Sequence, residues 1–122
     1  MAAPIVTQGV HHITLVGADR QTSIDFWQGT LGMPFVFEQP NLDDAEQAHL
    51  YFDPGDGRLI TIFTREDWPH DTTPNPGSGN VHHIAFSVSR AMYMQAAERL
   101  RAAGFANSGE VDRGFMDSLY FR

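Results

Sequence analysis

The sequence contains VHHITLV at residues 10–16 and VHHIAFSV at residues 81–88, so one short pattern occurs twice in 122 residues. Two further landmarks follow each copy in the same order. Gly32 matches Gly104, and Tyr51-Phe52 matches Tyr120-Phe121. An offset of about 70 residues is too long for a solenoid repeat, and it indicates two copies of one small module.

The first module, residues 1–66, is predicted to have the order β-α-β-β-β. Asp19 or Thr22 is the expected N-cap of its helix, and Gly32 is expected in the left-handed position at the helix end. Alternation, β-branched residues and turn residues place the strands. The expected elements are a strand at Val10–Val16, the helix with Ile24, Trp27 and Leu31 on its apolar side, and strands at Phe35–Gln39, His49–Phe52 and Leu59–Thr64.

The second module, residues 81–122, repeats this order but is expected to be incomplete at its C-terminus. Residues 67–80 are rich in proline and glycine and are predicted to form a linker. By comparison with the first module, one more strand is expected after Arg122. The expected elements are a strand at Val81–Val88, a helix at Arg90–Ala103 between Ser89 and Gly104, and strands at Phe105–Val111 and Ser118–Phe121.

The predicted fold class is α+β, with the two pseudo-symmetric modules forming a curved, cup-like mixed sheet around a metal cavity. Strand alternation puts His12 and Thr14 on one face of the first strand and Ile13 and Leu15 on the other. The face with Ile13 and Leu15 is the more apolar and is expected to meet the helix. His12 is therefore expected to point into the cavity.

The same alternation points His83 into the cavity from the second module and turns His11 and His82 to the opposite face. Pseudo-symmetry is expected to bring His12 and His83 together. Two neutral imidazoles are good ligands for a divalent metal, and a third carboxylate ligand would leave positions open for substrate and O₂. The alternative is that each His-His pair is only a hydrogen-bonded polar feature near a strand start, but its repetition at equivalent positions favours the metal.

Composition excludes several classes of function. The net charge is −7, with 8 Lys and Arg against 15 Asp and Glu, which disfavours nucleic-acid binding. Cysteine is absent, so no disulfide framework or thiolate ligand is expected. No apolar run approaches the ~20 residues of a membrane span, and residues 1–9 do not resemble a signal peptide. A cytoplasmic protein is expected.

Four stretches of the chain resemble the vicinal oxygen chelate superfamily, which includes glyoxalase I, bleomycin-resistance proteins and extradiol dioxygenases. Within it, the chain looks most like the ring-cleaving dioxygenases that act on hydroquinones and related aromatics, which are usually longer. The stretches are His11–Val16, Asp25-Phe26-Trp27 with Leu31-Gly32-Met33, His82–Phe86, and Asp112-Arg113 with Ser118–Arg122.

The resemblance implies that His12 and His83 bind the metal, with a Glu beyond Arg122 as third ligand. In the first module the matching slot, ten residues after Tyr51, holds Thr61, where glyoxalase I enzymes typically have a Glu or Gln ligand. The resemblance also implies roles around the metal, or in proton transfer, for five further residues. These are His11, Thr14, His82, Arg113 and Tyr120. His49 and His70 are expected to be surface or structural residues.

The expected function is an Fe(II)-dependent, extradiol-type dioxygenase that cleaves small aromatic diols or hydroquinones with O₂. Mn(II), Ni(II) and Zn(II) are the alternative metals, and a homodimer is the expected assembly. A glyoxalase-like lyase or isomerase would use the same fold, but Thr61 disfavours it. A metal-free binding protein of the bleomycin-sequestering kind is the third alternative, and the two His-His pairs disfavour that class.

Overall fold

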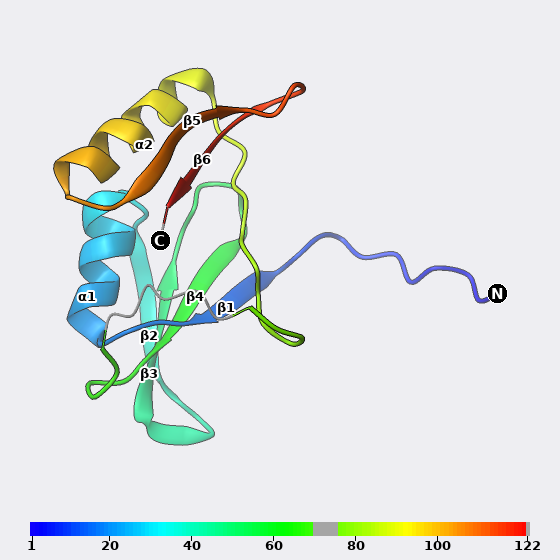
Figure 1. The fold of residues 1–122 in the computed structure, drawn as a ribbon. Coiled ribbons are helices and arrows are strands. Elements are labelled where there is room, and N and C mark those ends of the chain that lie inside the picture. Colours follow the sequence, from blue (N-terminus) through cyan, green and yellow to red (C-terminus); the bar gives the residue numbers. More distant parts are fainter. Residues whose placement is uncertain (70–75, 122) are drawn as a thin grey trace. The chain divides into compact units, whose positions relative to one another are not determined.

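The structure is a computed structural model that describes residues 1–69 and 76–121. The chain divides into two compact units, Met1–His70 and Asp71–Arg122, each with its own sheet and helical segment (Figure 1). In the predicted linker, residues 67–69 and 76–80 form no helix or strand. His70, predicted to be a surface or structural residue, lies outside the described residues.

A four-stranded mixed sheet forms the first unit, in the order β1-β4-β3-β2. The parallel pair is β1 with β4, and the other neighbours are antiparallel. This sheet confirms the predicted α+β class and the four predicted strands, although β1 begins two residues later and β3 five residues earlier than expected. The strands are β1 (His12–Val16), β2 (Phe35–Asn41), β3 (Asp44–Phe52) and β4 (Leu59–Thr64).

The helical segment of the first unit begins as the α-helix α1 (Arg20–Ile24) and continues as the π-helix η1 (Asp25–Thr30). Asp19 is the N-cap, because its carboxylate accepts a hydrogen bond from the backbone N–H of Thr22 at 2.9 Å. Thr22 is therefore the capped residue rather than the alternative cap. Gly32 ends the segment with φ of 72°, as predicted. The wider π turn was not predicted.

The core of the first unit lies between this helical segment and one face of the sheet. Leu50, Phe52, Ile60 and Ile62 form its buried centre. The partly buried hydrophobic residues that pack against it confirm that the apolar face of β1 meets the helix. They are Ile13, Leu15, Ile24, Trp27, Met33, Phe35 and Ala48.

One buried hydroxyl in this layer has no hydrogen-bond partner among the described residues. The Thr64 side chain is 1% exposed, and its hydroxyl makes no hydrogen bond to the described residues. A buried hydroxyl without a partner costs about 1–3 kcal/mol. We therefore expect Thr64→Val to raise the free energy of unfolding by about 1 kcal/mol, measured by urea denaturation. An unchanged or lower midpoint would contradict this expectation.

The second unit contains the helix α2 (Arg90–Ala102) and a hairpin of β5 (Asn107–Asp112) and β6 (Asp117–Phe121). Ser89 caps α2 as predicted, and Gly104 follows the helix with φ of 78°. The Arg90 guanidinium lies 3.0 Å from both Glu110 and Asp117, which ties the helix start to the hairpin. No helix in residues 1–69 or 76–121 has the length and apolarity needed to cross a bilayer.

The strand predicted at Val81–Val88 is wrong, because residues 81–89 form neither strand nor helix. A strand exists only when its backbone groups bond to a neighbour. In the first unit, β4 provides that neighbour for β1. In the described part of the second unit, β5 and β6 pair only with each other, so the matching partner for residues 81–88 is not there.

Candidate functional site

The first His-His pair lies at the start of β1, where both imidazoles are exposed. The Nδ1 atoms of His11 and His12 are 2.9 Å apart, and the two rings meet edge to face. A neutral imidazole has one N–H, so one ring donates and the other accepts. When His12 donates from Nδ1, its Nε2 keeps a lone pair that is available to a metal.

The second pair repeats this contact. The Nδ1 atoms of His82 and His83 are 2.8 Å apart, and the ring planes cross at 76°. Alternation was expected to turn His11 and His82 away from their partners. Both residues lie outside regular strands, since His11 precedes β1 and residues 81–89 form no strand, so strict alternation does not apply.

Three predicted site residues of the second unit come together around one aromatic ring. The His83 imidazole and the Tyr120 ring are 6.3 Å apart between centroids. On β6, Tyr120 also lies under the Arg113 guanidinium, whose central carbon is 5.3 Å from the ring centroid. A cation over a tyrosine face is a favourable contact. The second unit therefore presents imidazole, phenol and guanidinium groups together.

On β1, Thr14 contacts residues that sequence reasoning did not assign to a site. Its hydroxyl oxygen lies 2.6 Å from that of Thr61, which is fully buried on β4. The same Thr61 oxygen lies 2.8 Å from Nε2 of His49 on β3. His49 in turn places Nδ1 3.1 Å from the Tyr51 hydroxyl. The Thr61 hydroxyl is thus engaged on two sides.

These residues could have been found from strand alternation. His49 and Tyr51 alternate with Leu50 and Phe52, which are fully buried in the core. The polar residues must therefore face the opposite side of the sheet. His49, expected to be a surface or structural residue, is half-buried there and hydrogen-bonded through both ring nitrogens.

Aromatic rings continue this surface across three strands. The His49 ring lies 4.4 Å from the rings of both Tyr51 and Phe63. On β2, Phe37 contacts Tyr51 with centroids 5.2 Å apart, and its side chain is 54% exposed. The first unit therefore offers a row of ring faces on the same side of the sheet as His12.

Residues 9–122 match the Glyoxalase/Bleomycin resistance protein/Dioxygenase superfamily. The chain belongs to this superfamily. The resemblance found in the sequence is therefore confirmed over nearly the whole chain.

Similar proteins of this superfamily include a Bacillus subtilis (strain 168) protein named "Putative ring-cleaving dioxygenase MhqO". It is 34% identical over 84 residues, which cover 69% of this chain and 27% of that protein. A solved structure described as a "putative dioxygenase" from Bacillus subtilis has a TM-score of 0.79 and 27% identity, covering 94% of this chain and 37% of that one. This chain therefore spans well under half of the length of both proteins.

A third superfamily member shows the fold alone. The E126Q mutant of FosX, a fosfomycin resistance protein from Listeria monocytogenes, has a TM-score of 0.68 at 22% identity. The alignment covers 96% of this chain and 85% of that one. That protein was solved with Mn(II) and 1S,2S-dihydroxypropylphosphonic acid.

The superfamily implies a divalent metal, and two of its candidate ligands have suitable chemistry. In both His12 and His83, Nδ1 contacts the neighbouring imidazole, and Nε2 has no hydrogen bond to the described residues. That is the arrangement of a histidine ready to bind a metal through Nε2. Within residues 1–69 and 76–121, however, no cluster of three or more His, Cys, Asp or Glu side chains forms a complete site.

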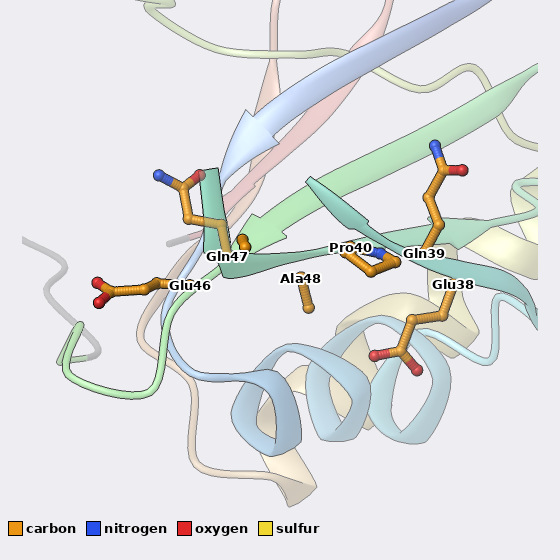
Figure 2. A pocket seen from close by; sticks show the side chains of 7 residues that line it. Glu38, Gln39, Pro40, Glu46, Gln47 and Ala48 are labelled. Carbon is orange, nitrogen blue, oxygen red and sulfur yellow. The ribbon is translucent and has the colours of Figure 1, made fainter. Parts of the chain in front are cut away.

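A separate hollow of about 430 Å³ lies along β2 and β3 and holds none of the predicted site residues (Figure 2). Glu38 projects from it toward α1, where both carboxylate oxygens accept from Arg20 at 2.9 and 2.8 Å. Glu46 is paired with Arg65 at 2.7 Å. Because both carboxylates are neutralised by arginine, the hollow lacks the free charge that would attract a cation.

The environment of His49 predicts a pH dependence of stability. Burial lowers the pKa of its imidazole from 6.5, and the nearby positive charge of His12 acts in the same direction. The unfolded chain therefore binds this proton more readily than the folded protein, so stability is lost as the pH falls below about 6.5. We expect the urea midpoint to fall between about pH 7 and pH 5.5, with a smaller fall in His49→Gln. Equal slopes in the two proteins would contradict this assignment.

Proposed function

We propose that this chain is part of an Fe(II)-dependent, extradiol-type dioxygenase that cleaves small aromatic diols or hydroquinones. The observation that carries the proposal is the duplicated His-His contact, which has the same Nδ1 geometry in both units. Similarity to a protein named as a ring-cleaving dioxygenase supports the reaction class.

His12 and His83 are the proposed metal ligands, each through Nε2. His11 and His82 are proposed to accept a hydrogen bond from Nδ1 of the neighbouring ligand, which fixes the tautomer and orientation of that ring. A carboxylate is the proposed third ligand. When bound, Fe(II) supplies the one-electron chemistry that connects an electron-rich ring with O₂.

Arg113 and Tyr120 are proposed to handle charge and protons at the substrate. The positive charge of the Arg113 guanidinium can neutralise a phenolate oxygen. The Tyr120 hydroxyl can exchange a proton with a substrate hydroxyl, and His82 is a second candidate for that role. Arg113 holds its position over the Tyr120 ring, so the two groups would act on the same part of the substrate.

The aromatic row of the first unit is proposed to contact the substrate ring. Phe37, Tyr51 and Phe63 present ring surfaces, and aromatic pairs stack with centroids 4.5–7 Å apart. Such a surface favours a flat, electron-rich ligand over a small aliphatic one. It therefore supports a phenolic substrate rather than the hemithioacetal of a glyoxalase.

The proposal is tested by O₂ uptake. The protein is purified under anaerobic conditions, loaded with Fe(II), and supplied with a panel of catechols and hydroquinones in an oxygen-electrode cell. We expect consumption of one O₂ per ring opened, with loss of the aromatic absorbance. His83→Ala, taken through the same Fe(II) treatment, is the matched control, and we expect it to consume no O₂. Metal-bound protein that consumes no O₂ with any member of the panel, or that turns over methylglyoxal with glutathione, would contradict ring cleavage.

A further inference from the structure

A continuous hydrogen-bond chain crosses all four strands of the first unit. It runs from Gln39 on β2 to Tyr51 and His49 on β3, then to Thr61 on β4 and Thr14 on β1. The successive heavy-atom distances are 3.2, 3.1, 2.8 and 2.6 Å. We refer to these five residues as the cross-strand chain. Of these five residues the proposed function uses only Tyr51, and only for the surface of its ring.

The hydrogen bonds of the cross-strand chain can run in either direction, depending on which group of each pair donates. Gln39 donates from its amide nitrogen to the Tyr51 oxygen. Each hydroxyl has one hydrogen, and a neutral imidazole has one N–H and one acceptor nitrogen. If Tyr51 donates to Nδ1 of His49, then Nε2 donates to Thr61, and Thr61 donates to Thr14. In the reverse direction, Tyr51 would accept two hydrogen bonds and its own hydrogen would have no acceptor among the described residues.

Acidity favours the first direction. The phenolic hydroxyl of a tyrosine is more acidic than the aliphatic hydroxyl of a threonine, so it is the stronger hydrogen-bond donor. An unprotonated imidazole nitrogen is a strong acceptor, so the best match pairs the Tyr51 hydroxyl with Nδ1 of His49. Burial supports a neutral His49, because it lowers the pKa of this imidazole. Thr61, which is fully buried, has no water with which to replace either link.

One hydrogen then remains unused at the end of the chain. Thr61 donates to Thr14, so the hydrogen of the Thr14 hydroxyl has to find an acceptor outside the cross-strand chain. Thr14 and His12 are on the same face of β1, two residues apart. A ligand atom close to His12 is thus within the region that Thr14 can reach.

We propose that the cross-strand chain fixes the Thr14 hydroxyl as a hydrogen-bond donor to an electron-rich oxygen of a ligand held beside His12. Gln39, Tyr51, His49 and Thr61 are positioning residues, since they act through Thr14. The ligand class is an oxygen anion on an aromatic ring, and this identity rests on the proposed function. The direction of hydrogen-bond donation along the cross-strand chain does not depend on the proposed function.

The direction is tested by the tautomer of His49, read from its ring ¹⁵N chemical shifts in the metal-free full chain at neutral pH. We expect the proton on Nε2 in the wild type. We expect mixed tautomers in Thr61→Val and in Tyr51→Phe, each of which removes one neighbour of the imidazole. Thr64→Val is the matched control, because it makes the same change on the opposite face of β4, and it should leave the tautomer unchanged. A proton on Nδ1 of wild-type His49 would overturn the proposal. So would an unchanged His49 tautomer in both Thr61→Val and Tyr51→Phe.

The donor role of Thr14 is tested by binding of 4-nitrophenol to the Mn(II)-loaded chain, followed by absorbance. We expect Thr14→Val and Thr61→Val each to weaken binding about tenfold and the double variant to lose no more than either alone. Thr14→Val removes the donor, and Thr61→Val acts only through that donor. Thr64→Val should bind as the wild type does. Full additivity, or no loss in Thr61→Val, would overturn the proposal. A wild-type protein that fails to bind the probe would contradict the proposed function instead. The tautomer of His49 would then be the only test of the direction of the cross-strand chain.

Discussion

Replacement of either His12 or His83 by alanine is expected to abolish stoichiometric metal binding while leaving the helix and strand content intact. Loss of a residue that merely orients a ligand lowers metal affinity about 10–100-fold, so loss of a ligand itself should cost more than 100-fold. Both imidazoles are exposed, and their removal takes no atoms from the core. The measurement is Mn(II) titration by isothermal calorimetry, with circular dichroism to check folding.

The design of this experiment separates a ligand from its neighbour. His11→Ala and His82→Ala remove only the group that contacts Nδ1 of the ligand, so they should give the smaller, 10–100-fold loss. His70→Ala is a control for the number of histidines, since no role in binding is assigned to it. A wild-type stoichiometry in both His12→Ala and His83→Ala would refute the metal assignment.

Phe52→Ala is expected to have the largest effect on stability, a loss of about 3–5 kcal/mol in the free energy of unfolding. The Phe52 side chain is completely buried at the end of β3. Its ring contacts those of Phe35 and Trp27, with centroids 5.4 and 6.3 Å apart, so its loss would leave a cavity between the sheet and the helical segment. A loss of this size is comparable with the whole stability of a small domain.

A second phenylalanine provides the comparison. Phe37, on the neighbouring strand β2, is 54% exposed, so Phe37→Ala should cost about 1 kcal/mol or less. Chemical denaturation of both variants measures the difference, and Phe52→Leu, which keeps most of the volume, should have an intermediate midpoint. Equal losses in Phe52→Ala and Phe37→Ala would contradict the placement of the core.

Local patterns were sufficient to predict most of the fold. Asp19, Gly32, Ser89 and Gly104 marked the helix ends, because capping and left-handed geometry depend on a few neighbouring atoms. Residues 81–88 were predicted to be a strand because they resemble residues 10–16. That prediction failed because a strand also requires a partner, which a local pattern does not reveal. The π turn at Asp25–Thr30 likewise has no signal that distinguishes it from an α-helix.

The candidate site was predictable in part. Duplication identified the two His-His pairs, and the family resemblance brought in Arg113 and Tyr120. In the structure, His83 and Arg113 both contact the Tyr120 ring. The contacts of His49 with Thr61 and of Tyr51 with Gln39 were not predicted, because they join different strands. The convergence of His12 and His83 on one metal stays a prediction.

The parallel pairing of β1 with β4 also has a consequence for the order of assembly. Thr14 and Thr61 are 47 residues apart along the chain, whereas β2, β3 and β4 follow one another through short connections. Closing the longer loop costs more entropy before any contact is gained, so the three-stranded meander should condense first and β1 should dock last. His12 would then reach its final place only in the closing stage of folding, and destabilising changes in β1 should accelerate unfolding with little effect on the refolding rate.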